Sequence, residues 1–382
     1  MKKQLYTVLA VFSLLTAQAQ EAKLAAADKQ YEKYAYVDAI KTYERVAEKG
    51  YKSVDLFQKL GNAYYFNAEL DKANKWYAEL FAMNQPVDAE YYYRYSQTLK
   101  SVGDYEKANQ MLSQFNQKNA ADLRAQLYTK HKDYLEDIKA NSGRYKVENI
   151  NINSEYSDYG TAFFDNKLVF ASARDTGGIF NRKHQWTNQS FTKLYASEIS
   201  SDGSMLEPEQ FNTSLNTKFN EATPVFTKDG KTVYFTRNNY NKGKRGKNSD
   251  KATLLKIYKA TLEKGKWVNV TELPFTSDNY STAHPALSPD EKTLYFASDM
   301  PGTLGQSDLF KVAINADGSF GTPENLGKQV NTEGRETFPY VTDENELYFA
   351  SDGQLGLGGL DVFVTQINKD GSYGEIKNVG AP

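Results

Sequence analysis

The spacing of hydrophobic positions changes once along the chain, near residue 145. Between about residues 22 and 118 apolar residues recur at helical spacing, and Pro86 is the only proline. After Tyr145 apolar and polar residues alternate, as in "TLYFAS" (293–298) and "ELYFAS" (346–351). A period of two is typical of β-strands. The pattern therefore predicts a helical N-terminal part followed by an all-β part.

The helical part repeats itself about every 34 residues. The clearest unit, "LGNAYYFNAELDKANKWYAELFAMNQP", begins at Leu60, and Ala39, Ala73 and Ala108 share one register with an aromatic residue or Leu four positions later. This pattern resembles the tetratricopeptide repeat, a helix pair in which small residues let the two helices approach closely. We expect three such repeats over residues 20–118, forming an α-α superhelix.

The resemblance implies a concave groove lined by the first helix of each pair, which in this family commonly takes a peptide or a partner helix. The positions expected to face it are Asp28, Tyr31, Glu32, Asn62, Tyr65, Phe66, Gln97 and Lys100. The alternative is that the repeats form a spacer whose exposed aromatic residues cover the neighbouring domain. Residues 119–143 follow as one capping or linker helix that ends at Gly143.

The β part contains four copies of one sequence motif. Asp-Gly-Ser turns recur at 202–204, 317–319 and 370–372, and Asp-Gly pairs are strong hairpin signals. The second strands of the four copies centre on Phe170, Phe235, Phe296 and Phe349. Four antiparallel strands per unit of this size correspond to one propeller blade. The chain is therefore expected to be an α+β multidomain protein with a β-propeller over residues 144–382.

Two phrases carry a resemblance to known propellers. "PALSPDEKTLYFASD" (285–299) is similar to the WD-repeat-like propeller of the periplasmic TolB type. "SDGQLGLGGLDVF" (351–363) resembles envelope proteins of the Bacteroidota, in which a signal peptide, tetratricopeptide repeats and this propeller precede an OmpA-like peptidoglycan-binding domain. The resemblance implies a protein associated with the outer membrane that often works with the type IX secretion and gliding apparatus.

The N-terminus has the pattern of a secretory signal peptide over residues 1–19. Lys2 and Lys3 form the basic region, 5–15 is apolar, and Ala17-Gln18-Ala19 fits the cleavage rule. The expected location is the periplasm, with no transmembrane span.

Composition excludes several kinds of chemistry. The chain has no cysteine and three histidines, and its net charge is −2 with both signs well mixed, which argues against nucleic acid as the main partner. Gly356, Gly358 and Gly359 do not fit a dinucleotide-binding fingerprint and are expected in a loop between two strands. Asp308 and Asp361 are expected to accept backbone N–H groups and to hold such loops.

We expect no catalytic residue, no metal site, no cofactor and no enzyme activity, and we interpret His284 as a packed blade residue. The leading hypothesis is a non-catalytic scaffold or adaptor for protein–protein interactions with outer-membrane or secretion-machinery proteins. Contact with peptidoglycan would come through a domain beyond residue 382. The alternatives are binding of a peptide or glycan at the propeller mouth, or a propeller hydrolase using carboxylates such as Glu221 and Glu336.

One strand is surplus in this scheme. Residues 145–152 align with the outer strands of the later copies, which gives five outer strands for four sets of inner ones. We therefore expect the natural polypeptide to continue past Pro382 with at least one more blade.

Overall fold

The computed structural model describes residues 24–175 and 183–382, and the chain divides into two compact units. The first contains the described residues up to Lys118 together with His184–Asn188, and the second contains the remainder of the described chain. The signal peptide expected at residues 1–19 lies outside the described residues. No helix among the described residues is long and apolar enough to cross a membrane.

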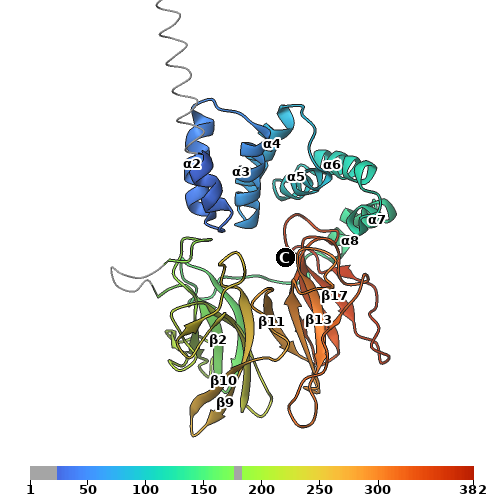
Figure 1. Ribbon diagram of the computed structural model, residues 1–382. Coiled ribbons are helices and arrows are strands. Elements are labelled where there is room, and N and C mark those ends of the chain that lie inside the picture. Colours follow the sequence, from blue (N-terminus) through green and yellow to red (C-terminus); the bar gives the residue numbers. More distant parts are fainter. Residues whose placement is uncertain (1–23, 176–182) are drawn as a thin grey trace, which may run out of the picture. The chain divides into compact units, whose positions relative to one another are not determined.

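The first unit is built from helices that pack on their neighbours in chain order (Figure 1). They are a helix over residues 24–31, α2 (Tyr36–Glu48), α3 (Val54–Phe66), α4 (Leu70–Ala82), α5 (Ala89–Ser101) and α6 (Tyr105–Lys118). A Cβ atom at Gly61 of α3 would lie 2.3 Å from the Tyr77 ring of α4. The close approach of α3 to α4 therefore requires glycine at this position.

The repeat register predicted from small residues coincides with the core of the helical unit. Ala39, Ala73 and Ala108 are all fully buried, and so are Tyr43 and Tyr77, four positions after the first two. The expected helical class is confirmed, with helices stacked along the chain.

The segment predicted as one linker helix forms two, α7 (Leu123–Lys130) and α8 (Tyr134–Asn141), both in the second unit. The prediction of one helix was wrong, because helical φ/ψ angles stop at His131, which has ψ 66 and caps α7. The end of α8 is tied to the last residues of the chain, since the Ala381 N–H donates to Ser142 Oγ at 2.9 Å.

Four antiparallel sheets make up the rest of the second unit, and we call them blades 1 to 4 (Figure 1). Blade 1 contains β1 (Asp158–Phe164), β2 (Lys167–Ser172), β3 (Lys193–Glu198) and β4 (Glu209–Gln210); blade 2 contains β5 (Glu221–Phe226), β6 (Thr232–Asn238), β9 (Leu255–Glu263) and β10 (Lys266–Glu272). Blade 3 contains β11 (Thr282–Leu287), β12 (Thr293–Ser298), β13 (Asp308–Ala313) and β14 (Glu324–Asn325); blade 4 contains β15 (Glu336–Val341), β16 (Glu346–Ser351), β17 (Asp361–Gln366) and β18 (Lys377–Asn378). A separate hairpin, β7 (Tyr240–Asn241) and β8 (Lys244–Arg245), is inserted in blade 2.

The first strand of each blade contacts the first strand of the next, in the manner of a β-propeller. Tyr159 of β1 also meets Phe338 of β15 edge to face, with ring centroids 6.3 Å apart. The expected propeller of four visible blades is confirmed.

Every first strand has a bulge at the same place. The bulged positions are Gly160, Thr223, His284 and Phe338, with φ between +45° and +63°. A positive φ is unusual for any residue other than glycine, so three blades hold a strained residue there. The bulge bends each first strand where the blades converge.

Residues 145–152 form no strand, so this sequence-based prediction was wrong. Alternating residues form a strand only beside a free strand edge, and β4 and β18 already pair with β3 and β17. Only Ile152 of the segment is buried, against Leu168 and Phe170 of blade 1. The extra strand on which the expectation of a longer chain rested is therefore absent from the described residues.

Candidate functional site

A polar network joins successive helices of the first unit. The Tyr43 hydroxyl donates to Asp28 Oδ1 at 2.5 Å, and Lys59 Nζ on α3 lies 2.8 Å from the same oxygen. Lys59 also pairs with Asp55 at 2.8 Å. One carboxylate thus links three helices of the stack.

The same arrangement occurs one repeat later. The Tyr77 hydroxyl donates to Asn62 Oδ1 at 2.9 Å, and Arg94 Nη1 on α5 donates to the same oxygen at 2.7 Å. Asn62 and Tyr77 lie 34 residues after Asp28 and Tyr43. Two successive repeats therefore each hold a tyrosine hydroxyl and a cation from the next repeat on one side-chain oxygen.

Arg94 is surrounded by aromatic rings. Its guanidinium carbon lies 5.0 Å from the Phe66 ring centroid and 6.0 Å from that of Tyr91. Arg94 Nε donates to Glu90 at 3.1 Å, and the side chain of Arg94 is 14% exposed. We call Tyr31, Asn62, Phe66, Tyr91 and Arg94 the Arg94 surface. A fixed guanidinium among aromatic rings can bind a carboxylate and an apolar side chain together.

The surface also contains a hydroxyl that stays protonated. Burial raises the pKa of Tyr31, while a hydrogen bond with Asn62 and the nearby charge of Arg94 act against the shift. The Tyr31 hydroxyl is therefore available as a hydrogen-bond donor over the whole physiological pH range.

The eight positions expected to line the groove lie in three different environments. Asp28, Tyr31, Asn62, Tyr65 and Phe66 lie in or beside the two networks. Glu32 is exposed and takes no part in them, while Gln97 and Lys100 on α5 are buried.

The residues that sequence reasoning missed are the cations Lys59 and Arg94. They precede Asn62 and Gln97 by three residues, and residues three apart share one face of a helix. Lys59 and Arg94 therefore occupy equivalent positions of successive repeats, 35 residues apart, although the sequence does not show which oxygen each cation reaches.

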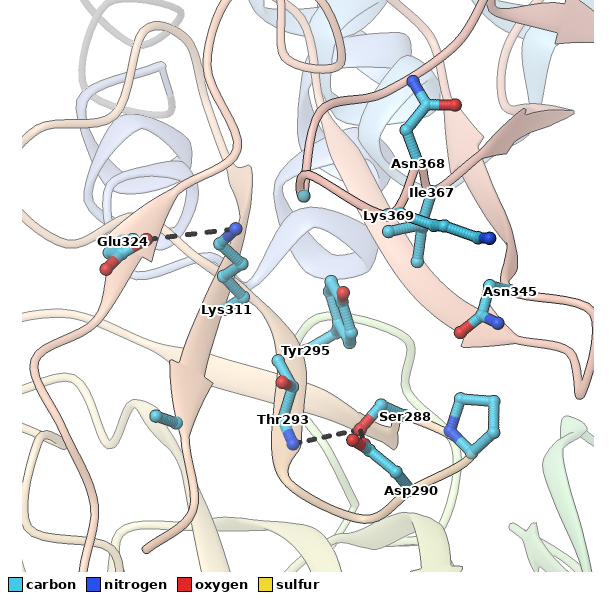
Figure 2. Close-up of a pocket in the computed structure, with 13 residues that line it drawn as sticks. Ser288, Asp290, Thr293, Tyr295, Lys311, Glu324, Asn345, Ile367, Asn368 and Lys369 are labelled. Atoms are coloured by element: carbon cyan, nitrogen blue, oxygen red, sulfur yellow. Dashed lines mark hydrogen bonds and ion pairs between the residues drawn. The ribbon is translucent and has the colours of Figure 1, made fainter.

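A second candidate site is a pocket of about 550 Å³ between blades 3 and 4 (Figure 2). Figure 2 shows Lys311 of β13 beside Glu324 of β14, with Lys369 and Asn368 of the β17–β18 connection across the opening. The Lys311–Glu324 ion pair is 3.9 Å long, and Glu324 is largely exposed. Mixed charges and amides suit a polar ligand that is held by hydrogen bonds.

The two carboxylates considered for hydrolysis are already engaged by their own blades. Glu221 accepts hydrogen bonds from the Thr217 N–H at 2.9 Å and from Arg237 Nε at 2.9 Å. Glu336 accepts from the Thr332 N–H at 2.9 Å and from Ser351 Oγ at 2.6 Å.

Burial raises the pKa of Glu336 to about 8 and that of Glu221 to about 7, the latter against the charge of Arg237. Both carboxylates hold the loop that leads into their blade. Asp158 of blade 1 holds the corresponding loop through the Ser154 N–H, at 2.6 Å.

Three smaller predictions about the blades are confirmed. Asp308 accepts the Leu304 N–H at 2.9 Å, and Asp361 accepts the Gly358 N–H at 3.2 Å, so both carboxylates hold loops. His284 of blade 3 is partly buried, and its ring stacks on Phe338 of blade 4 with centroids 3.9 Å apart. Burial lowers the pKa of His284 to about 4.

No protein-family model matches the chain, and no curated protein matches it. Several solved structures match part of the chain. TolB from Acinetobacter baumannii is 15% identical over 59% of this chain and 44% of its own, with a TM-score of 0.34. A puromycin-hydrolyzing peptidase of Mycobacterium tuberculosis is 13% identical over 58% of this chain and 31% of its own, with a TM-score of 0.33. An alpha-L-arabinofuranosidase from Lactobacillus brevis is 11% identical over 58% of this chain and 69% of its own, with a TM-score of 0.36.

The matched proteins include TolB as well as hydrolases of different substrates, so this chain's likeness to them concerns fold and not function. They correct one expectation, that the chain is not an enzyme. A peptidase and a glycosidase stand among the matches, so the fold does not exclude hydrolysis.

Proposed function

We propose that this protein is an adaptor of the cell envelope that binds a segment of a partner protein on the Arg94 surface. The observation that carries the proposal is the fixed guanidinium of Arg94, held by Asn62 at 2.7 Å against the Phe66 ring. Tyrosine and arginine are the residues that contribute most to protein–protein binding, because they combine a large contact area with directed hydrogen bonds.

The chemistry of this surface defines the partner segment. Arg94 suits an acidic side chain or a C-terminal carboxylate, and the rings of Tyr31, Phe66 and Tyr91 suit an apolar side chain beside it. Lys59, the equivalent cation one repeat earlier, supplies a second positive charge along the same stack. A short acidic and apolar peptide segment therefore fits best.

The location and the partners are part of the same proposal. The signal-peptide pattern and the resemblance to Bacteroidota envelope proteins support a periplasmic protein associated with the outer membrane. They also support partners among outer-membrane or type IX secretion components. A link to peptidoglycan would need an OmpA-like domain carried by the natural polypeptide.

The test is photocrosslinking from Tyr91, replaced by benzoylphenylalanine, in envelopes of the source organism. Tyr91 is half-buried, so the aromatic replacement keeps most of its contacts. We expect a defined crosslinked partner that disappears with Arg94→Ala and persists with Arg45→Ala, an exposed arginine of α2. A crosslinking pattern that is the same in both variants would refute the role of this surface.

A second candidate function is favoured by the pocket between blades 3 and 4, which could take a peptide or a glycan. A ligand that binds only the folded protein raises its melting temperature. We therefore expect a muropeptide or an oligosaccharide that occupies this pocket to stabilise the wild type and not Lys311→Ala. Equal stabilisation of both would place the ligand elsewhere.

A further inference from the structure

A five-residue segment from between strands β2 and β3 belongs to the helical unit. It reads His184-Gln-Trp-Thr-Asn188, and its ends are joined by a hydrogen bond from the Asn188 N–H to the His184 carbonyl at 2.8 Å. Asn188 has φ +54°, the conformation that closes such a turn. The segment is thus a compact turn that presents the side chain of Trp186.

The indole of Trp186 lies between two tyrosines. Its ring is parallel to that of Tyr34, with centroids 5.7 Å apart and planes 7° apart, and it meets Tyr36 edge on at 5.0 Å. Tyr36 in turn stacks on Phe66 at 6.0 Å. Parallel and edge-on contacts are the two arrangements that aromatic pairs prefer.

The indole N–H has a partner of its own. Trp186 Nε1 donates to the main-chain carbonyl of Phe66, the last residue of α3, at 3.3 Å. The last carbonyls of a helix have no intrahelical donor and lie at the negative end of the helix dipole. This carbonyl therefore selects an aromatic side chain with an N–H over phenylalanine.

Trp186 is the side chain of this segment that packs against the apolar core of the helices. Gln185, Thr187 and Asn188 are exposed, and Tyr34 stays 45% exposed beneath the indole. The other two tryptophans differ, because Trp76 and Trp267 are buried in the cores of their units. Trp186 therefore occupies a partly open site on the helices, in the way that the side chain of a bound ligand would occupy it.

We propose that Tyr34, Tyr36 and the Phe66 carbonyl form a recognition site for a tryptophan presented on a peptide turn, which we call the indole site. The chain's own His184–Asn188 turn is an internal ligand of the indole site, and it competes with a partner protein that carries a similar turn. This goes beyond the proposed function, since the contacts differ from those of Arg94. Phe66 is shared, its ring facing Arg94 and its carbonyl facing the indole.

The test uses a peptide of residues 183–190, closed into a ring and labelled, with the full chain as receptor. Fluorescence anisotropy is measured with wild-type protein and with Trp186→Ala. We expect binding to Trp186→Ala and at least about tenfold weaker binding to the wild type, because the internal turn occupies the site and only the open fraction can bind.

Three controls make the result specific. The same peptide with alanine in place of tryptophan should not bind. The double variant Trp186→Ala, Tyr34→Ala should lose binding, and since Tyr34 is half exposed this change leaves the helical core intact. The double variant Trp186→Ala, Arg94→Ala should keep it, so failure of the Arg94 proposal and failure of this one are distinguishable. Equal binding to wild type and Trp186→Ala, binding to neither, or binding that survives Tyr34→Ala would overturn the proposal.

Discussion

Glu221 and Glu336 provide a matched test of how this propeller holds a buried carboxylate. Each begins the first strand of its blade, is fully buried, and accepts hydrogen bonds from a threonine four residues earlier. They differ in the residue paired with them on the second strand, which is Arg237 for Glu221 and Ser351 for Glu336. The perturbation is Glu→Gln at each site, which removes the titratable group and keeps its shape.

The two substitutions should differ in cost at neutral pH. Glu221→Gln leaves the Arg237 guanidinium, whose side chain is almost fully buried, without its carboxylate. Removing one partner of a buried ion pair costs about 3–5 kcal/mol. Glu336→Gln breaks no ion pair and keeps an oxygen for the Thr332 N–H, so at low pH its cost is that of one altered hydrogen bond, about 1 kcal/mol, and at pH 7 its cost is smaller still.

The pH dependence has a definite sign. Burial raises the pKa of Glu336 to about 8, whereas the unfolded chain releases this proton near its ordinary value of 4.5. Between these values the folded state binds more protons than the unfolded state, so the free energy of unfolding falls as pH rises, by about 1.4 kcal/mol per unit. Glu336→Gln lacks this titration, so the variant should gain on the wild type from pH 5 to pH 8.

The measurement is urea unfolding of the full chain at pH 5, 7 and 8.5, followed by the fluorescence of Trp267 in blade 2. Replacing Trp76 and Trp186 by phenylalanine leaves Trp267 as the only indole reporter. Equal losses for Glu221→Gln and Glu336→Gln at pH 7 would refute the ion-pair reasoning. A difference between wild type and Glu336→Gln that does not change with pH would refute the buried-acid reasoning.

Three further predictions concern packing and titration in the blades. An alanine in the left-handed conformation costs roughly 1–2 kcal/mol. Gly160→Ala should destabilise the protein by well more than this in urea unfolding, because its Cβ would lie 2.6 Å from the Thr223 methyl group. Gly203→Ala, also at positive φ but with no neighbouring atom nearby, should cost only the conformational term. Leu309 and Val362 occupy the same position in the third strands of blades 3 and 4 and are 0% and 46% exposed. Leu309→Ala should lower the free energy of unfolding by about 2–5 kcal/mol and Val362→Ala by less than about 1 kcal/mol. Equal losses would contradict the blade alignment. His284, whose pKa burial lowers to about 4 from 6.5, should make the wild type lose stability as pH falls through that range, and His284→Phe should remove this slope in thermal melts.

The sequence predicted the repeats well because their signals are local. The register of Ala39, Ala73 and Ala108 is set by helix packing, and all three are buried as expected. The Asp-Gly-Ser turns close the hairpins for the same local reason, with Ser319 donating to Asp317 in blade 3 and Ser372 to Asp370 in blade 4.

The predictions failed where the conformation or contacts of a segment depend on residues that are distant in the sequence. Residues 145–152 alternate as a strand should, yet no free strand edge is available beside β3 or β17. A periodic pattern tells which conformation a segment favours, whereas strand formation also requires a partner. The indole site is a similar case, because nothing in the sequence connects Trp186 with Tyr34, 152 positions earlier.

The oxygens at the centre of the two polar networks were among the predicted positions, whereas the cations that bind them were missed for a physical reason. Counting forward from the small residue of each repeat identifies Asp28 and Asn62, the oxygens on which the networks centre. The cations reach these oxygens from the next repeat, 31 and 32 residues further along. That contact depends on how successive helix pairs stack, which the sequence of one repeat does not contain.

The exposed apolar residues of blade 4 are a property of the repeat and do not by themselves mark a ligand site. "TLYFAS" of β12 and "ELYFAS" of β16 differ in one residue, yet β12 is buried at five successive positions and β16 only at alternate ones. Leu309 beside β12 is buried in one core with Leu347 of blade 4, whereas Val362 beside β16 is 46% exposed. The pattern gives each blade two apolar faces because each blade is built to lie between two others. The strand sequence therefore predicts the conformation of the strand. Its solvent exposure depends on whether another sheet packs against it, which the strand sequence does not contain.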